Sequence, residues 1–319
     1  MRVLCVGGCG YIGAWLVPHL LADGHKVTVF DAQHFGDGSL PKQNDSLKVI
    51  KGDVRDAVAF RNACKDQEAV IYLAGLTNND MCEKYPELSI SINRKGFAQA
   101  MDSAMNAGVK RFIFASSVAG YGSSEAPAIE TQKMEPTTEY AKAKEYCEWW
   151  LKFYCRLGFS TTIVRSASVC GFSPRQRFDL TVNKMVYDAM LNGVVTVNGG
   201  EQKRSHIHIK DISDFYKLLL KAPLKKIAGE VFNVVAENQT VLETSQLVAA
   251  ALKAKIEIKP RTDTRSYSVD GTKAREVLGF TPKKRVADAI RDLKIGFDSG
   301  YWQDSETNDA YRNVVHGLS

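Results

Sequence analysis

The feature that most constrains the fold is a glycine-rich turn near the start of the chain. Residues 2–6 form a short apolar run typical of a strand, and residues 11–22 have the character of a helix. Between them, Gly7, Gly10 and Gly13 follow a G-x-x-G-x-x-G spacing. The first glycine permits a tight turn, the second lets backbone N–H groups approach a pyrophosphate, and the third lets the helix pack against the strand. The pattern therefore predicts a strand, a phosphate-binding turn and a helix.

Beyond this turn, short β-branched runs alternate with longer helical stretches. Such alternation is typical of βαβ units, whose right-handed crossovers build a parallel sheet with helices on both faces. We therefore expect an α/β fold with a Rossmann-type doubly wound parallel sheet. The expected strands are residues 26–31, 47–52, 69–74, 111–116 and 160–165, and the expected longer helices are residues 86–106 and 138–157.

After about residue 170 the alternation loosens, which we interpret as a smaller C-terminal α/β substrate lobe with some elements returning to the main sheet. We expect a cofactor-binding domain in residues 1–170, this lobe in residues 171–300, and a polar, loosely docked tail in residues 301–319. In the lobe we expect helices at residues 178–191, 212–220, 244–253 and 286–297 and strands at residues 194–197, 206–209, 231–235 and 256–258.

The composition argues against several classes of protein. The net charge is only +6 and the basic residues are scattered, so no nucleic-acid partner is expected. Apolar runs such as residues 247–252 are far shorter than the roughly 18 residues that a membrane span needs. Glycines interrupt the first apolar stretch, which disfavours a secretion signal. The seven cysteines form no C-x-x-C pair and fit a reducing cytoplasm better than a disulfide framework or a zinc site, so we expect a cytoplasmic protein without a metal.

Two aspartates at strand ends bear on the cofactor. Asp31 closes the second strand, where a carboxylate accepts hydrogen bonds from adenosine ribose hydroxyls and repels a 2′-phosphate. No basic residue directly follows it, which favours NAD over NADP. Asp53, at the end of the third strand, could accept a hydrogen bond from the adenine amino group. The alternatives are a solvated acid for Asp31 and, for Asp53, a helix N-cap before the stretch that starts at Asp56.

A tyrosine and a lysine four residues apart form the candidate catalytic pair. Tyr140 and Lys144 would share one face of a helix, where the ammonium favours the phenolate form. Tyr140 could then take a proton from a sugar hydroxyl while hydride passes to a nicotinamide. Ser116 and Ser117 end the preceding strand, and Ser117 would hydrogen-bond the reacting oxygen. The alternatives are surface helix residues for the pair and a simple turn cap for Ser117.

Together these motifs resemble the extended short-chain dehydrogenases/reductases of the nucleotide-sugar epimerase/dehydratase family, the group that contains UDP-galactose 4-epimerase. The resemblance covers about residues 1–297 and is much less specific to one substrate than to the superfamily. It rests on segments 7–13, 52–56, 73–75, 93–96, 115–122, 140–144 and 204–211. It implies catalysis by Ser117, Tyr140 and Lys144, and NAD bound by Gly7, Gly10, Tyr11, Ile12, Gly13, Asp31, Asp53, Val54, Leu73, Ala74, Gly75, Asn93, Ser116, Tyr140 and Lys144.

The resemblance also implies a nucleotide-diphosphate sugar as substrate. Arg204 would grip the pyrophosphate, since a bidentate arginine suits a pair of phosphate oxygens. Ser168 stands where many members carry an Asn, so that contact is altered. Arg265 resembles a phosphate-side arginine, with Arg261 an equal candidate. The implied substrate contacts are Thr77, Ser117, Ser168, Asn183, Arg204 and Arg265. A metal held by His206 and His208 is not expected, because no third ligand is evident nearby.

Members of the family share an opening oxidation of the sugar, usually at C4, and differ in the later steps of the reaction. The 4,6-dehydratases carry an Asp-Glu pair just after the catalytic serine or threonine, whereas Val118 and Ala119 stand at those positions here. Because neither can move a proton, we expect 4-epimerisation through a transient 4-keto sugar. The open alternatives are a C4 dehydrogenase or ketoreductase that releases or reduces a keto sugar, and a protein that binds NAD(H) without chemistry.

By the same resemblance we expect a homodimer, with the helices at residues 86–106 and 138–157 forming a four-helix interface. The alternative is ordinary packing of both helices against their own sheet. The apolar candidates for the interface are Leu88, Ile92, Phe97, Met101, Met105, Trp149, Trp150 and Phe153.

Overall fold

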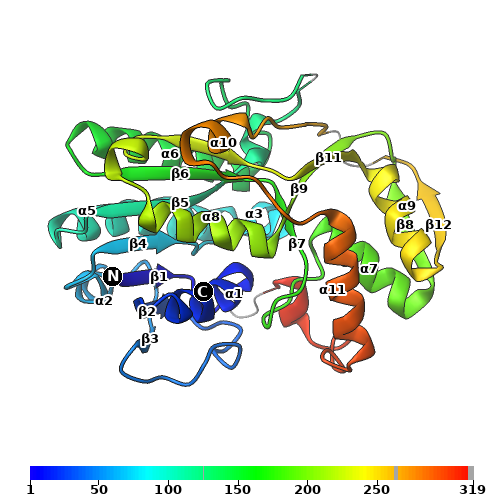
Figure 1. Cartoon of the computed structure of the whole chain (residues 1–319), viewed down its shortest axis with the longest axis horizontal. Helices are drawn as coiled ribbons and strands as arrows, with labels where there is room; N and C mark the ends of the chain where they lie inside the picture. Colours follow the sequence, from blue (N-terminus) through cyan, green and yellow to red (C-terminus); the bar gives the residue numbers. More distant parts are fainter. Residues whose placement is uncertain (125, 262–264, 315–319) are drawn as a thin grey trace.

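A parallel sheet forms the centre of the computed structural model, which describes residues 1–124, 126–261 and 265–314 (Figure 1). In this part of the chain, seven parallel strands follow the order β3-β2-β1-β4-β5-β6-β10. The winding reverses between β1 and β4, the switch point at which ligands bind in such sheets. The expected Rossmann-type α/β fold is confirmed. The strands are β1 (Arg2–Val6), β2 (Lys26–Asp31), β3 (Leu47–Lys51), β4 (Ala69–Tyr72), β5 (Arg111–Ser117), β6 (Thr161–Ser166) and β10 (Val231–Val234).

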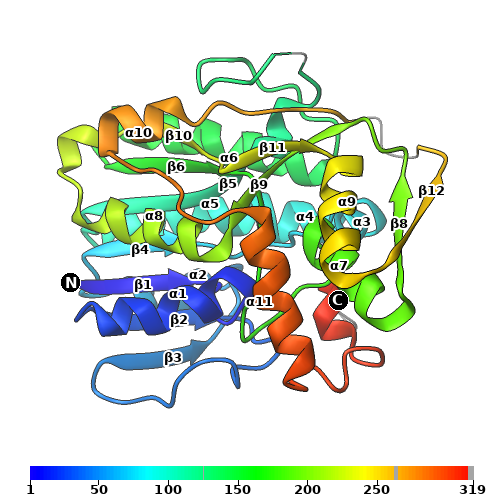
Figure 2. The same ribbon diagram turned by 45° about the vertical axis from the view of Figure 1, so that its right-hand side comes forward.

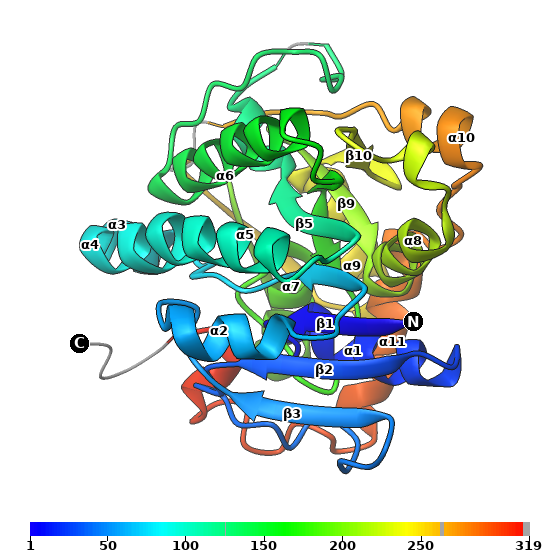
Figure 3. The ribbon, with the colours of Figure 1, turned by 90° about the vertical axis from the view of Figure 1, so that its left-hand side faces the viewer.

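Helices cover both faces of this sheet (Figure 3). One face carries α1 and α8 over a core that includes Leu16 and Phe215, and the other carries α2, α5 and α6 over Phe97 and Leu151. The strands between these cores are apolar on both faces, as expected for a buried parallel sheet. These helices are α1 (Tyr11–Ala22), α2 (Ala57–Cys64), α5 (Phe97–Asn106), α6 (Glu139–Arg156) and α8 (Ile209–Lys221).

The helix expected over residues 86–106 is continuous but not regular. A π-helical segment, η1 (Ile90–Gly96), lies between α4 (Pro86–Ser89) and α5. Such segments often occur at functional sites. Apolar periodicity did not reveal it, because the change from i+4 to i+5 hydrogen bonds concerns the backbone.

Most of the second half of the chain builds a smaller C-terminal lobe, the one expected to bind the substrate, from two small sheets and their helices. One sheet has the order β11-β9-β7, with β11 antiparallel to β9, and the other pairs β8 with β12 in parallel. Figure 2 shows α9 and the β8–β12 pair at the end of the molecule opposite the N-terminus. The elements are β7 (Ser168–Cys170), α7 (Thr181–Asn192), β8 (Val194–Asn198), β9 (Lys203–His208), β11 (Glu237–Thr240), α9 (Val241–Leu252), β12 (Lys255–Lys259) and α11 (Val286–Asp298). The helix α10 (Thr272–Leu278) returns to the main sheet, where it packs against β10.

The last described segment, residues 301–314, is packed against this lobe rather than loosely docked. Trp302 is 3% exposed and lies among Phe172, Phe178 and Phe297. A short helical turn, η4 (Asp309–Arg312), follows it. Among the residues that the structure describes, no helix is long and apolar enough to cross a membrane.

Candidate active site

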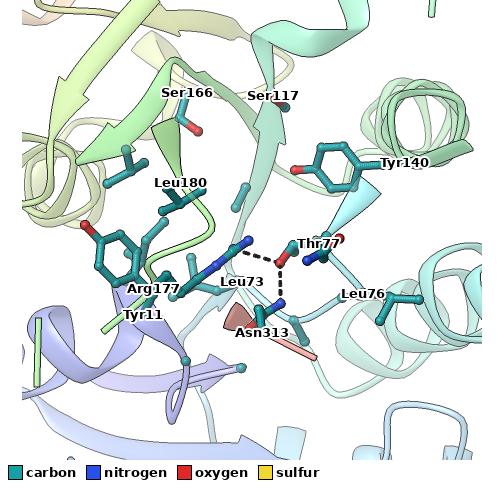
Figure 4. A pocket seen from close by; sticks show the side chains of 18 of the residues that line it. Tyr11, Leu73, Leu76, Thr77, Ser117, Tyr140, Ser166, Arg177, Leu180 and Asn313 are labelled. Atoms are coloured by element: carbon teal, nitrogen blue, oxygen red, sulfur yellow. Dashed lines mark hydrogen bonds between the residues drawn. The ribbon is translucent and has the colours of Figure 1, made fainter. Parts of the chain in front are cut away.

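A cavity of about 510 Å³ lies at the carboxyl ends of the main strands, where they meet the substrate lobe. Its lining runs from the glycine turn and the ends of β2 and β3, past β4 and β5, to Tyr140, Arg204 and Arg265. Figure 4 shows side chains from both halves of the chain pointing into it. One continuous pocket therefore joins the expected cofactor groove to the expected substrate contacts.

The glycine turn is shaped for a dinucleotide phosphate. Gly7 has a φ of +79°, and a Cβ there would lie 2.6 Å from the backbone nitrogen of Ala74. A Cβ on Gly13 would lie 2.4 Å from the carbonyl oxygen of Gly8, so only glycine allows α1 to start this close to β1. Gly10 is the N-cap of α1 and no acidic residue lies in the first turn, which leaves a helix N-terminus suited to an anion. The residues present thus fit the pyrophosphate of NAD.

Asp31 and Asp53 line the part of the pocket at the ends of β2 and β3. Asp31 Oδ2 accepts a hydrogen bond from Cys9 N at 2.9 Å, and Oδ1 accepts one from Gln33 N at 2.7 Å. Burial raises the pKa of the Asp31 carboxyl, and these two N–H groups oppose that rise. Asp53 is paired with Arg55 at 2.7 Å. The capping interpretation of Asp53 is wrong, because the Asp56 carboxylate caps α2.

The loop after β4 forms one wall, and a side chain from η1 supports it. Leu73, Ala74 and Gly75 line the pocket as expected. Asn93 is not among the described residues that line the cavity. Its Oδ1 accepts from Leu76 N at 2.8 Å and its Nδ2 donates to Leu76 O at 2.9 Å. Asn93 therefore holds the wall in shape from behind rather than facing the cofactor.

The expected catalytic residues come together at the centre of the pocket. The Lys144 Nζ donates to Ala115 O at 2.6 Å and lies 5.5 Å from the centre of the Tyr140 ring. Ser117 Oγ accepts from Ala119 N at 3.1 Å, so it does cap η2 (Val118–Tyr121), and it also lines the pocket. The Tyr140 hydroxyl points into the cavity, towards the strand that carries Ser117 (Figure 4).

Behind this centre lies a buried ion pair that the sequence reasoning missed. The Ser116 Oγ donates to Glu148 Oε1 at 2.6 Å, so this hydroxyl is engaged in the interior. Arg165 donates to both carboxylate oxygens of Glu148, at 3.0 and 2.7 Å, and to the Tyr121 hydroxyl at 2.7 Å. The i, i+4, i+8 spacing of Tyr140, Lys144 and Glu148 on α6 was a signal that could have revealed it.

The predicted substrate residues divide into two groups. Thr77, Ser168, Arg204 and Arg265 line the pocket together with Ser117. Arg204 Nη1 donates to Arg265 O at 2.7 Å, which ties these two segments together.

Asn183, by contrast, is not among the described residues that line the cavity. Its Oδ1 accepts from Gly171 N at 3.0 Å, and its Nδ2 donates to the Tyr11 hydroxyl at 3.1 Å. Asn183 therefore joins the lobe to the first turn of α1, behind the pocket wall.

Two further residues that were not named among the candidate contacts face the pocket. Arg177, in the loop between β7 and α7, is paired with Asp179 at 2.5 Å, and Asn313 follows η4 near the end of the described chain. Neither belongs to a motif, and both reach the pocket through contacts between distant segments.

Comparisons with known proteins agree with this geometry. The pattern of the "NAD dependent epimerase/dehydratase family" matches residues 3–235. A "UDP-glucose 4-epimerase" of Mycolicibacterium smegmatis is 29% identical, over 91% of this chain and 96% of that protein. The solved structure of a UDP-glucose 4-epimerase from Thermotoga maritima with UDP-glucose has a TM-score of 0.83 at 25% identity, over 94% of this chain and 99% of that one.

The dehydratases of this group share the fold as well. A dTDP-glucose 4,6-dehydratase from Streptomyces venezuelae, with NAD bound, has a TM-score of 0.87 at 24% identity, covering 96% of this chain and 99% of that one. At this identity the likeness shows the fold alone, so the reaction must be argued from the residues in the pocket.

Proposed function

The chain belongs to the NAD-dependent epimerase/dehydratase family of enzymes, and on that premise we propose that it is a nucleotide-sugar 4-epimerase. NAD is its cofactor. When bound, NAD supplies the nicotinamide that accepts and returns the hydrogen at the sugar C4. The residues that we propose to hold it are those that line the cofactor half of the pocket, from Gly7 to Lys144.

Tyr140 would move the proton. Its hydroxyl points into the cavity, and the Lys144 ammonium lies beside it, where it can stabilise negative charge that develops on the tyrosine oxygen. A phenolate at this point can take the proton from the sugar 4-hydroxyl. It can return that proton after the 4-keto sugar has rotated in the pocket and presents its other face to the nicotinamide. Ser117 would donate to the same sugar oxygen and fix its position.

Val118 and Ala119 favour epimerisation over 4,6-dehydration. They directly follow Ser117, line the pocket, and are 1% and 8% exposed. A 4,6-dehydratase needs an acid and a base here to move protons at C6 and C5, and apolar side chains can serve as neither. The arrangement supports oxidation and re-reduction at a single carbon, which is sufficient for epimerisation.

The part of the pocket lined by Arg204 and Arg265 supports a diphosphate on the substrate. Arg204 on β9 and Arg265 in the segment after β12 both line the pocket and are joined by the 2.7 Å bond from Arg204 Nη1 to Arg265 O. The Arg204 guanidinium also lies 5.3 Å from the centre of the Tyr267 ring. Two guanidinium groups and an aromatic ring form a suitable site for a nucleoside diphosphate.

The test is a product analysis. Purified protein with NAD is offered UDP-, dTDP-, GDP- and CDP-hexoses, the NADH absorbance band is followed, and products are identified by NMR. An epimerase forms the 4-epimer without net NADH. A keto sugar with accumulating NADH would instead identify a C4 dehydrogenase, and NADH binding without turnover of any sugar would identify a non-catalytic protein.

We also propose that the enzyme is a homodimer. Phe97 and Met101 are buried in the chain's own core, so they are excluded from the interface set. Trp149 and Phe153 on α6 are 59% and 39% exposed, with parallel rings 5.8 Å apart. Covering these rings by a second copy would remove exposed apolar surface from water. Size-exclusion chromatography with light scattering measures the mass of the protein in solution. Trp149→Glu should shift the population from dimer towards monomer.

A further inference from the structure

Three side chains from distant segments meet across the pocket. Arg177 Nη1 donates to Thr77 Oγ1 at 3.0 Å, and Asn313 Nδ2 donates to the same oxygen at 3.3 Å (Figure 4). Thr77 belongs to the loop after β4, Arg177 to the loop before α7, and Asn313 to the C-terminal segment. All three line the cavity. We call them the Thr77 cluster.

Asn313 is held from behind as well as from the pocket side. Its Oδ1 accepts from Arg175 Nη2 at 2.9 Å, and the neighbouring Arg312 O accepts from Asn78 Nδ2 at 3.3 Å. Its φ of +56° lies in the left-handed region, which asparagine tolerates better than most residues. Both polar groups of the Asn313 side chain are therefore used to join the C-terminal segment to the two halves of the pocket.

The base of this segment is anchored independently of the pocket. Trp302 is buried in the lobe core, Phe178 N donates to Tyr311 O at 2.6 Å, and the Tyr187 hydroxyl donates to Ser305 O at 3.2 Å. The contacts of Asn313 can consequently open while the rest of the segment stays in place.

A buried arginine, Arg175, supports the cluster from behind the wall of the pocket. Arg175 is 6% exposed, its Nε has no hydrogen-bond partner in the described part of the chain, and its guanidinium lies 3.8 Å from the centre of the Phe35 ring. Asp179 pairs with Arg177, whereas Arg175 makes no ion pair among the described residues. A buried cation without a counter-ion is unfavourable. Arg175, which is not among the described residues that line the cavity, therefore depends on its neutral acceptors, Asn313 Oδ1 and Gln176 O.

We propose that the Thr77 cluster closes over bound NAD(H) and that Asn313 is a positioning residue that slows release of the cofactor. The cluster joins the strand-end wall to the substrate-lobe wall of the cavity that contains the glycine turn. A dinucleotide seated on that turn must therefore break these bonds to leave. The inference builds on the proposed reaction, in which the same NAD must stay bound between oxidation and re-reduction.

The experiment measures cofactor release without any sugar. Protein loaded with NADH is mixed with excess NAD, and the loss of bound-NADH fluorescence gives the release rate. Asn313→Gly removes both side-chain bonds and keeps the left-handed backbone unstrained. Thr77→Val keeps the shape and removes the shared acceptor. Glu306→Ala, exposed on the same segment and away from the pocket, is the matched control.

Asn313→Gly and Thr77→Val are each expected to speed NADH release about tenfold, as the loss of two modest hydrogen bonds implies. Glu306→Ala should leave the rate unchanged. Equal rates in all four proteins would overturn the proposal. A faster rate in Thr77→Val alone would overturn the role of Asn313. Because no sugar is present, these rates do not depend on whether the enzyme proves to be an epimerase.

Discussion

Removal of the charge on Glu148 should destabilise the fold strongly. Glu148 and Arg165 are 1% and 2% exposed, and the carboxylate accepts hydrogen bonds from Arg165 Nε, Arg165 Nη2 and Ser116 Oγ. Burial lowers the pKa of the Arg165 guanidinium, but the bonds and charge of Glu148 more than reverse this, so Arg165 stays charged. Glu148→Gln leaves that cation in the interior without a counter-ion.

The size of the effect depends on the contacts that Arg165 keeps. In Glu148→Gln the guanidinium retains the Tyr121 hydroxyl at 2.7 Å, and the glutamine oxygen can still accept from one donor. The glutamine NH₂ group, however, faces another donor. Breaking a buried pair in this way costs about 3–5 kcal/mol, and the conserved volume adds no cavity, so we expect about 3 kcal/mol. That is a large part of the roughly 5–15 kcal/mol that stabilises a typical protein.

Urea unfolding followed by far-UV circular dichroism, without NAD, measures this loss. Arg165→Met and the double variant complete a cycle in which the double variant should lose less than the sum of the singles. Asp298→Asn, which breaks an ion pair with Lys294 that is about half exposed, serves as the control and should cost less than about 1 kcal/mol. A loss no larger than this control in Glu148→Gln would refute the argument.

Three further predictions concern the proton donor, pH and thiol reactivity. Tyr140→Phe should keep NADH binding, measured by fluorescence titration, and lower the turnover number by about 10²–10⁴-fold. The control Tyr146→Phe, on the same helix, should retain the full turnover number. Full activity in Tyr140→Phe would contradict the proposed proton transfer. Burial lowers the pKa of His206 from 6.5 to about 4, so the unfolded chain binds the proton more readily. Stability should therefore be complete above about pH 6.5 and fall as pH drops towards 4, by about 2 kcal/mol at pH 5 from this residue. His206→Asn should reduce this dependence of stability on pH, measured by urea unfolding at about pH 6.5 and about pH 5. If the variant lost as much stability between these pH values as the parent protein, the role of His206 would be rejected. Cys155 is half-buried, whereas the other cysteines are buried. Iodoacetamide under native conditions should therefore modify Cys155 first by mass spectrometry, and first modification at Cys9, whose pKa burial raises well above 9.0, would refute this.

The cofactor half of the pocket could be predicted because its signals are local. The glycine turn and Asp31 each lie at the end of one strand, and the order of the sheet brings such ends to a single edge. Tyr140 and Lys144 lie on one face of a helix because they are four residues apart, which the sequence alone reveals. These predictions needed no knowledge of how the second half of the chain packs.

The Thr77 cluster could not be predicted in this way. Arg177 and Asn313 lie 100 and 236 residues from Thr77 in the sequence, and no periodicity links them. The polar composition of residues 301–319 suggested loose docking, whereas the burial of Trp302 by aromatic rings of the lobe fixes the described part of this segment. Such contacts depend on the assembled fold.

Side-chain direction was a second limit. Asn183 and Ser116 occupy the expected elements, but Asn183 turns towards Tyr11 and Gly171, and the Ser116 hydroxyl turns towards Glu148. In both cases a buried partner from another element determines where the polar group lies, since an unpaired polar group in the interior is costly.

The position of β10 affects how the chain can fold during synthesis. This strand pairs with β6, although the substrate-lobe elements from β7 to β9 are made between them. A ribosome adds about 5–20 residues per second, so the edge of β6 would await its partner for roughly 3–13 s after residue 166 is made. An unpaired strand edge invites association with other chains. We therefore expect the nascent chain to be most prone to aggregation in this interval, before residues 231–234 complete the sheet.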